Sequence, residues 1–279
     1  MTVVNDLSPF GHHAPRGLVA KVLRLTRHRR ESWLGRRFGF ACRAAGLALL
    51  RGAPQDVDAI GARMRLYPSH NVSEKNLLFT PHLFDPEERE LLASRIGEGF
   101  VFIDIGANVG GYSLFVAAQA GPHARILAVE PQPDIFERLV YNVRQNPFGS
   151  IKALECAVAD QDGEITMFLD PANSGESSVR FVHVRDQGPS VRVASKTLAT
   201  VLREERLDRI DALKVDVEGA EDLVLEPFFR TVPGRLWPTL LIVDNGSAQA
   251  TATVEALGDG RAYRKLLRTR SNDIFERIA

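Results

Sequence analysis

Short apolar runs alternate along the chain with segments in which apolar residues recur every three or four positions. A short apolar run predicts a buried strand, and the longer period predicts an amphipathic helix. The predicted strands are 101–105, 125–130, 151–158, 210–217 and 239–244, with predicted helices at 112–120, 133–146 and 197–205 between them. Strands that alternate with helices at this spacing indicate a doubly wound, mostly parallel α/β sheet with right-handed crossovers.

Two further patterns complete the expected sheet. The chain closes with a predicted helix at 251–257 and predicted strands at 263–267 and 272–277. The short turn between these strands favours a last strand that inserts antiparallel beside the fifth, so we expect seven strands in a Rossmann-like order. Residues 164–169 also alternate like a strand, and we expect them to form a hairpin with the strand before them.

Residues 1–64 differ from the rest, and we expect a basic helical N-terminal extension there, followed by one larger domain over 65–279. The basic side chains that crowd this stretch are Arg16, Lys21, Arg24, Arg27, Arg29, Arg30, Arg36 and Arg37. Apolar residues at three- and four-residue spacings between them predict amphipathic helix. Such a helix either lies on an anionic membrane surface, here through residues 16–37, or holds a partner, or caps its own domain. We favour the cap.

A buried strand runs into a glycine turn and then a helix at residues 100–111, FVFIDIGANVGG. Asp104 lies at the carboxyl end of the strand, and Gly106, Asn108 and Gly110 form the turn. Glycine lets the backbone turn sharply and approach a ligand closely, and the free amides of the following helix suit an anionic group. A tight turn without any ligand is the alternative interpretation.

Two cofactors use turns of this kind, and the residues favour one of them. A dinucleotide site has the pattern G-x-G-x-x-G, in which the second glycine packs against a diphosphate. Here Asn108 stands in the place of the second glycine, and the Asp104 carboxylate would repel a diphosphate. A carboxylate suits a ligand with an ammonium group and ribose hydroxyls, such as S-adenosylmethionine (SAM). A dehydrogenase is therefore the least favoured enzyme class.

Acidic residues also follow the second and third predicted strands. Glu130 ends the second strand, where it either accepts hydrogen bonds from ribose hydroxyls or caps the helix that opens near Pro133. Its place at a strand end favours the ribose. Asp160 either accepts a hydrogen bond from an adenine amino group or serves the turn at 160–163, and both interpretations are open.

The sequence LKVDVEGAE at 213–221 places charges at the end of the fourth predicted strand. Lys214, Asp216 and Glu218 share one parity and point to one side if the strand continues that far. Charges inside a buried parallel strand are costly unless they are paired or used. One interpretation is a Lys214–Asp216 ion pair. The other puts Asp216 at the transferable methyl group, with Glu218 and Glu221 near the acceptor. The two interpretations are compatible, because a paired lysine keeps Asp216 ionised.

Composition narrows the function classes. Lys+Arg and Asp+Glu are equal at 35 each, so no overall positive field argues for nucleic acid. Two distant cysteines, Cys42 and Cys156, fit neither a disulfide framework nor a metal site. No apolar run approaches the length of a membrane span and the beginning of the sequence lacks an apolar signal core, so we expect a cytoplasmic protein.

The motifs resemble the FkbM family of SAM-dependent, class I methyltransferases. The resemblance rests on FIDIGANVGGYSLFVA at 102–117, AVEPQP at 128–133, CAVADQDGEITMF at 156–168 and LKVDVEGAE at 213–221. It covers roughly residues 65–279 and implies O-methyl transfer, commonly to a hydroxyl of a sugar or of a secondary metabolite. One departure concerns the fifth strand, after which the family usually has a glutamate and a bulky pair. Here the chain reads Asp244-Asn245-Gly246, which keeps the charge on a shorter side chain.

Carried over position by position, the resemblance implies a complete set of roles. The methionine end of SAM would be lined by Asp104, Gly106, Asn108 and Gly110, the ribose bound by Glu130, the adenine side by Asp160, and the acceptor side met by Asp216. We further expect Lys214, Glu221 and Asp244 to bind the substrate. Hard carboxylates such as Asp216, Glu218 and Asp244 suit magnesium, but nothing in the sequence requires a metal.

We therefore expect an O-methyltransferase in which Asp216 is the catalytic base, Glu218 the second candidate and a histidine such as His70 or His183 a distant third. A glycan acceptor is the leading interpretation and a small secondary metabolite the second. A SAM-binding module without catalysis is the third. The acceptor, the methylated hydroxyl and the oligomeric state are not determined by the sequence.

Overall fold

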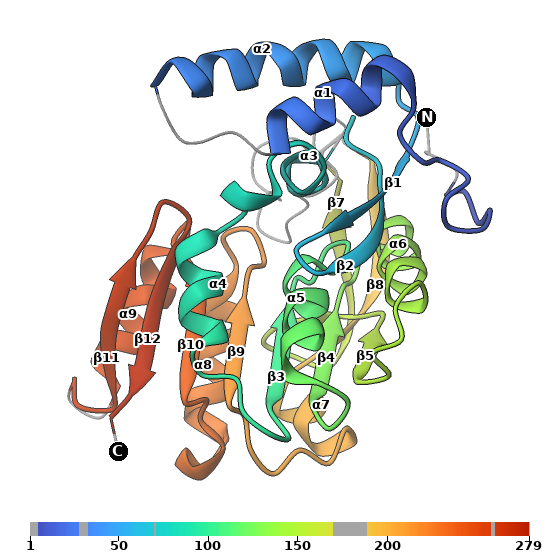
Figure 1. Cartoon of the computed structure of the whole chain (residues 1–279). Coiled ribbons are helices and arrows are strands. Elements are labelled where there is room, and N and C mark those ends of the chain that lie inside the picture. The colour runs from blue at the N-terminus through green and yellow to red at the C-terminus, as the bar shows by residue number, and fades with distance from the viewer. Residues whose placement is uncertain (1–4, 28–32, 70, 170–188, 258–259, 279) are drawn as a thin grey trace.

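A seven-stranded mixed sheet forms the centre of the molecule, with helices on both of its faces (Figure 1). The computed structural model describes residues 5–27, 33–69, 71–169, 189–257 and 260–278. The strands of the sheet are β3 Val101–Ile105, β4 Arg125–Val129, β5 Ile151–Leu154, β9 Ala212–Val215, β10 Leu240–Asp244, β11 Tyr263–Arg268 and β12 Asn272–Arg277.

The strand order is β11-β12-β10-β9-β3-β4-β5. The neighbours from β10 to β5 run parallel, whereas β12 is antiparallel to both β10 and β11. The predicted insertion of the last strand beside the fifth is therefore confirmed. Chain order reverses between β3 and β9, and in doubly wound sheets ligands bind outside the carboxyl ends of the strands at such a switch point.

Each face of the sheet carries its own hydrophobic core, because successive strand residues point to opposite sides. Phe102 and Ile126 belong to one core, and their neighbours Ile103 and Leu127 to the other. The first face is covered by α4 Pro86–Ala93, α5 Gly111–Ala120 and α6 Pro133–Arg144, and the second by α7 Leu198–Glu204, α8 Glu221–Thr231 and α9 Ala248–Ala256. Short 3₁₀ turns lie at Pro81–Leu83 and Gly234–Leu236.

The strand predicted at 151–158 is two strands in different sheets. Residues Ile151–Leu154 form the edge of the main sheet, whereas β6 Ala157–Val158 pairs with β8 Ser190–Lys196 in a three-stranded sheet. In that sheet β7 Gly163–Phe168 pairs antiparallel with β8, so the predicted hairpin between 164–169 and the preceding strand is wrong. Periodicity indicates that a segment is a strand but not which strand it pairs with.

The N-terminal part of the chain packs onto the main domain. It consists of α1 Gly17–Arg27, α2 Trp33–Leu50, the hairpin of β1 Gln55–Ala59 and β2 Ala62–Leu66, and α3 Val72–Phe79. The expected domain boundary between residues 64 and 65 falls inside this hairpin. Arg65 on β2 is buried and binds Asp56 on β1, with 2.6 Å between Nε and Oδ1.

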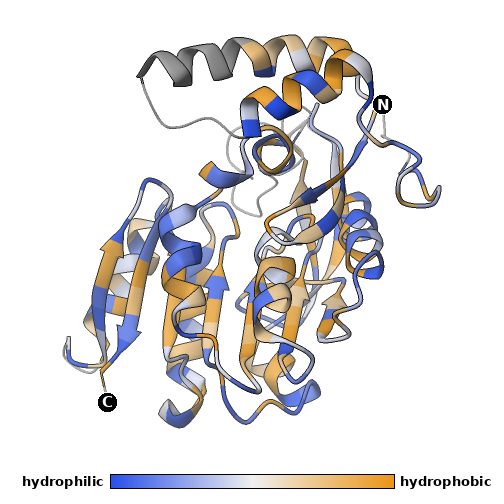
Figure 2. Ribbon diagram, in the orientation of Figure 1, coloured by the Kyte–Doolittle hydropathy of each residue, from blue (hydrophilic) through white to orange (hydrophobic). Residues whose placement is uncertain are grey.

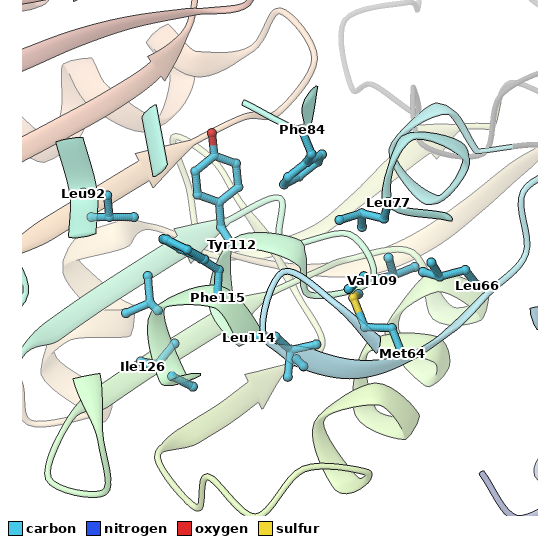
Figure 3. Packing of buried hydrophobic residues seen from close by; sticks show 14 of the residues in the cluster. Met64, Leu66, Leu77, Phe84, Leu92, Val109, Tyr112, Leu114, Phe115 and Ile126 are labelled. Atoms are coloured by element: carbon cyan, nitrogen blue, oxygen red, sulfur yellow. The ribbon is translucent and has the colours of Figure 1, made fainter. Parts of the chain in front are cut away.

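A second buried ion pair holds α3 against α6. The Arg138 Nη1 atom lies 2.6 Å from Oε1 of Glu74, and the Arg138 guanidinium covers the Tyr67 ring at 4.3 Å. Figure 3 shows Leu77 of α3 and Phe84 beside the first turn of α5, with Met64 and Leu66 close to the same helix. Residues before 100 therefore contribute directly to the core next to the glycine turn.

Candidate functional site

A pocket opens where β3, β4 and β9 end, and residues from both halves of the chain line it. Its floor is the turn after β3, one wall is the segment 156–159 with Met167, and the other wall comes from α3 and the residues before α4. The residues that line it include Ser73, Leu77, Phe84, Asp85, Asp104, Gly106, Asn108, Tyr112, Glu130, Gln132, Lys214, Asp216 and Glu218.

The glycine turn packs directly against the end of β9. Gly106 has φ +76°, and a Cβ placed on it would lie 1.9 Å from the carbonyl oxygen of Asp216. No side chain fits there, so this glycine lets β3 and β9 approach at the switch point. Gly110 has φ +94°, and a Cβ there would lie 2.9 Å from Leu139 of α6. Gly110 is not among the described residues that line the pocket, so its place is behind the turn.

Glu130 fixes the conformation of the turn. Its Oε2 atom accepts a hydrogen bond from the backbone amide of Asn108 at 2.9 Å, and its Oε1 atom accepts one from the amide of Gln132 at 3.0 Å. A carboxylate offers about four lone-pair sites, so two remain for a ligand. Burial, reinforced by the charges of Asp104 and Asp216, raises the pKa of Glu130 to about 7.

Asn108 joins the turn to the N-terminal part of the chain. It has φ +51°, a conformation that asparagine tolerates better than most residues. Its Oδ1 atom accepts a hydrogen bond from Asn71 Nδ2 at 2.9 Å. Asn71 is also the N-cap of α3, because its own Oδ1 accepts from the amide of Glu74 at 3.0 Å. The wall formed by α3 is thus tied to the glycine turn.

Asp104 is buried at the end of β3 with half of its carboxylate unused. Its Oδ2 atom accepts hydrogen bonds from the amide and the hydroxyl of Ser113, at 3.1 and 2.7 Å. Its Oδ1 atom is buried and has no partner within the described residues. Burial raises the pKa of Asp104, although Lys214 opposes the shift. A buried carboxylate oxygen of this kind is costly unless a ligand donates to it.

Lys214 and Asp216 form the ion pair that the sequence suggested. The Lys214 Nζ atom lies 2.7 Å from Asp216 Oδ2 and 5.0 Å from the centre of the Tyr112 ring. Burial lowers the pKa of the Lys214 amine, but Asp216 and Asp104 more than offset this, so its pKa is raised overall. The strand ends at Val215, so the parity argument does not extend to Glu218, which has φ +53°.

A second pocket adjoins the first. It is lined by Val72, Ser73, Asn76, Phe84, Asp85, Asp216, Glu218, Asp244, Ser271 and Asn272. Asp216 and Glu218 line both pockets, as do Ser73, Phe84 and Asp85. Asp244 ends β10 beside them, and its Oδ1 atom accepts a hydrogen bond from the Gly246 amide at 2.9 Å. Burial, and then the charge of Asp216, raises the pKa of Asp244.

Some predicted site residues lie elsewhere. Glu221 is buried and is not among the described residues that line either pocket. Its Oε1 atom accepts hydrogen bonds from the amides of Val217 and Gly219, both at 3.0 Å. It therefore shapes the loop that carries Glu218. Asp160 is exposed, and the pocket lining stops at its neighbour Ala159. His70 and His183 lie outside the described residues.

Several lining residues were not anticipated. Asp85 accepts a hydrogen bond from the Tyr112 hydroxyl at 3.0 Å, and burial raises the pKa of Asp85. In the sequence Asp85 directly precedes Pro86 and Tyr112 begins the predicted helix at 112–120, and neither position by itself signals a ligand site. For Ser73 the sequence does offer a signal, because residues 67–74 (YPSHNVSE) are mostly polar and precede the main domain, as is typical of a segment that covers a ligand or of a linker.

No metal site emerges from the part of the chain that the structure describes. Within it, no group of three or more His, Cys, Asp and Glu side chains has an arrangement suited to a metal ion. Both cysteines are free thiols, and burial raises the pKa of Cys156 in the pocket wall.

Comparison with known proteins gives a consistent result. Residues 104–237 match the family model described as the methyltransferase FkbM domain. Methyltransferase sdnD of Sordaria araneosa is 33% identical over 177 residues, which cover 53% of this chain and 65% of that protein. Hexuronic acid methyltransferase AglP of Haloferax volcanii is 28% identical over 141 residues, covering 49% of this chain and 53% of that protein.

A third relative and one solved structure complete the comparison. The 31-O-demethyl-FK506 methyltransferase FkbM of Streptomyces tacrolimicus is 28% identical over 155 residues, covering 46% of this chain and 58% of that protein. This chain thus spans between 53% and 65% of the length of these three relatives. The methyltransferase domain of METTL16 is similar in fold, with a TM-score of 0.50 at 17% identity over 93% of this chain and 90% of that domain.

Proposed function

Through residues 104–237 the chain belongs to the FkbM family of methyltransferases, and we propose that it transfers a methyl group from SAM to a hydroxyl of a sugar or glycan. The family assignment supports methyl transfer in general. The two pockets and the named relatives support SAM as the donor and a sugar hydroxyl as the acceptor.

The charge of the first pocket carries the proposal. Its described lining holds the carboxyl groups of Asp85, Asp104, Glu130, Asp216 and Glu218 and a single cationic side chain, that of Lys214. Such a lining attracts a ligand with positive groups and repels a diphosphate. SAM carries a sulfonium and an ammonium, whereas a dinucleotide carries two phosphate charges. The Asp104 Oδ1 atom, which has no hydrogen-bond partner among the described residues, gives an ammonium donor a buried acceptor.

Three groups of residues would hold SAM. Asp104 would accept from its ammonium group, and Glu130 would use its remaining lone pairs for the ribose hydroxyls. The segment 156–159 and Met167 would provide an apolar wall for the adenine. When bound, SAM supplies an electrophilic methyl group on its sulfonium, so the chain's own task is to position the acceptor and to remove a proton.

Asp216 is our candidate for the group that removes this proton. Its carboxylate lines both pockets, so an acceptor hydroxyl in the second pocket and the methyl donor in the first would both lie within its reach. The Lys214 Nζ atom lies 2.7 Å from Asp216 Oδ2 and holds this carboxylate in position. A positioned carboxylate can act as a general base. Glu218 lines the same two pockets and is the second candidate.

The second pocket suits a polyhydroxyl acceptor. Its described lining includes Ser73, Asn76, Ser271 and Asn272, which can donate to and accept from sugar hydroxyls. The relative from Haloferax volcanii is named for hexuronic acid, which favours a sugar. The relative from Streptomyces tacrolimicus is named for 31-O-demethyl-FK506, which favours a small secondary metabolite as the second candidate acceptor. Intact carboxylates at Asp216 and Glu218 argue against a binding module without catalysis.

Parallel calorimetric titrations with SAM, S-adenosylhomocysteine and NAD test the cofactor. We expect both sulfur ligands to bind and NAD not to bind, because the carboxylate-lined pocket repels a diphosphate. Binding of NAD alone would overturn the proposal. Radiolabelled methyl transfer to panels of glycans and of hydroxylated small metabolites would then separate the two acceptor classes, and SAM binding without transfer to either panel would favour the module.

The affinity for SAM is expected to rise with pH around neutrality. Below the pKa of about 7, Glu130 carries a proton that must leave before both of its oxygens can accept hydrogen bonds from the turn and the ribose. Between about pH 6 and about pH 7.5 this linkage amounts to a roughly five- to tenfold gain in affinity. Calorimetry at both pH values measures it. Glu130→Gln should remove this dependence, and an unchanged dependence in that variant would assign it to another group.

A further inference from the structure

One face of α1 remains exposed although the helix is docked on the domain. Leu23 and Thr26 are buried, and Val19 and Val22 pack against the same core, so this side of the helix caps the domain as the sequence favoured. The opposite side consists of Leu18, Lys21, Arg24 and Leu25, all exposed, and is called the α1 face below. Leu18 is 62% exposed and Leu25 is 45% exposed.

The neighbouring helix α2 adds apolar surface. In its last two turns Gly46 and Leu50 point inward, whereas the exposed residues are Ala44, Ala45, Ala48 and Leu49. The two helices pack on each other and form the outermost layer at one end of the molecule (Figure 1). Figure 2 shows hydrophobic colour along the described part of α2 and alternating hydrophilic and hydrophobic bands along α1.

Charge is distributed unevenly between this layer and the rest of the chain. The two helices of this layer, α1 and α2, contain six Lys or Arg residues and no acidic residue, although the whole chain has equal numbers of basic and acidic residues. On α1 itself there is no acidic side chain. The layer therefore carries a strong positive charge on an otherwise neutral chain, and it is complementary to an anionic surface.

We propose that the α1 face docks the protein on an anionic lipid bilayer. Leu18, Lys21 and Leu25 stand at positions i, i+3 and i+7, so the two leucines project beside a basic side chain on one side of the helix. Interfacial helices bind membranes in this way, with leucines in the acyl boundary and lysines or arginines at the anionic head groups. The contact leaves Leu23 and Thr26 in place, so the domain need not open.

The same residues argue against nucleic acid as the occupant. Single strands are held by basic grooves combined with aromatic side chains that stack on bases, and α1 has no aromatic residue. Phosphate contacts with a duplex require cations but give no reason to expose two leucines. A lipid surface uses both features at once. The face also lies close to the site, because α1 packs on α3, which lines both pockets.

Vesicle flotation with the full chain tests the docking. We expect binding to vesicles that contain phosphatidylserine, little binding to pure phosphatidylcholine, and release at high salt because screening weakens the attraction. Lys21→Gln with Arg24→Gln should weaken binding roughly thirtyfold, because each basic side chain near an anionic surface contributes about 1 kcal/mol of binding free energy. Leu18→Ser with Leu25→Ser should weaken it roughly tenfold or more through lost apolar burial.

Matched controls come from exposed residues outside the layer. Arg270→Gln and Ile278→Ser change an exposed cation and an apolar side chain that is 48% exposed, and both should leave vesicle binding unchanged. Circular dichroism and thermal melting check that every variant is folded. The readout does not involve methyl transfer, so its result and that of the SAM titration are independent.

Three results would overturn the proposal. One is failure of the chain to float with phosphatidylserine vesicles at low salt. Another is equal loss of binding in the control variants, which would show that the α1 face is not the contact. The third is binding of a different occupant. In one case the chain self-associates, and Leu18→Ser with Leu25→Ser disrupts only the oligomer. In the other, an RNA oligonucleotide displaces the vesicle, and RNA binding does not depend on these leucines. Such results would assign the surface to a second copy or to nucleic acid.

Discussion

Asp216→Asn is expected to lower the turnover number roughly a hundred- to ten-thousandfold, which is the usual contribution of a positioned general base. Asparagine has the same shape but cannot accept the hydroxyl proton. Lys214 keeps a partner in Asp104, whose charge already acts on it, so the pocket should stay intact. SAM should still bind, because the groups proposed to hold it, Asp104 and Glu130, are unchanged.

Steady-state kinetics, calorimetry and thermal unfolding of the same preparation separate these effects. A loss confined to turnover, with SAM affinity within a few-fold of the original, supports Asp216 as the base. Glu218→Gln is the matched control, because Glu218 lines the same two pockets. If Asp216→Asn keeps full turnover and Glu218→Gln does not, the role passes to Glu218. If both keep it, neither carboxylate is the base.

Gly106→Ala is expected to destabilise the fold by roughly 2–5 kcal/mol and to weaken SAM binding strongly, because backbone strain and overpacking add. The added Cβ would lie 1.9 Å from the Asp216 carbonyl oxygen, a backbone atom that cannot rotate away. Either β3 and β9 separate or the turn changes its path, and both disturb the floor of the pocket. Urea unfolding and SAM titration measure the two losses.

Gly121→Ala provides a control for the positive φ. Gly121 has φ +74°, close to the φ of +76° at Gly106, but a Cβ there would meet nothing within 4 Å. This variant should therefore show only the cost of its backbone conformation, roughly 1–3 kcal/mol, because φ +74° with ψ −172° is a region that glycine alone adopts readily; SAM affinity should be unchanged. Equal losses in the two variants would mean that the contact between β3 and β9 relaxes easily, contrary to our argument.

Much of the architecture could be predicted because its signals are local. The apolar runs at Val101–Ile105 and Leu240–Asp244 predicted buried strands, and alternation with helices predicted a doubly wound sheet. Asp104, Glu130 and Asp216 could be placed at one edge of the sheet, because the carboxyl ends of parallel strands meet there. The structure brings these three residues into one pocket. Their roles in binding and catalysis remain predictions.

Other parts of the site depend on contacts between distant segments. Ser73 and Asp85 reach the pocket because a buried Glu74–Arg138 ion pair and an Asn71–Asn108 hydrogen bond hold their segment in place. The two residues of the ion pair are 64 positions apart and those of the hydrogen bond are 37 positions apart, so local sequence patterns do not predict either contact. The partner strand of residues 163–168 was missed for the same reason. Glu221 was predicted at the acceptor, but its Oε1 atom accepts from two loop amides, and Glu221 is not among the described residues that line either pocket.

The sequence by itself therefore determined most strands of the main sheet, the helices that cover it, the glycine turn and the order in which that sheet is wound. These follow from backbone conformational limits and from the period of apolar residues, which act over a few positions. Only the tertiary structure decided which carboxylates face the pockets, which are consumed by backbone amides, and which side of α1 stays exposed. Those outcomes depend on packing between segments far apart in the chain, where burial and hydrogen-bond partners are set together.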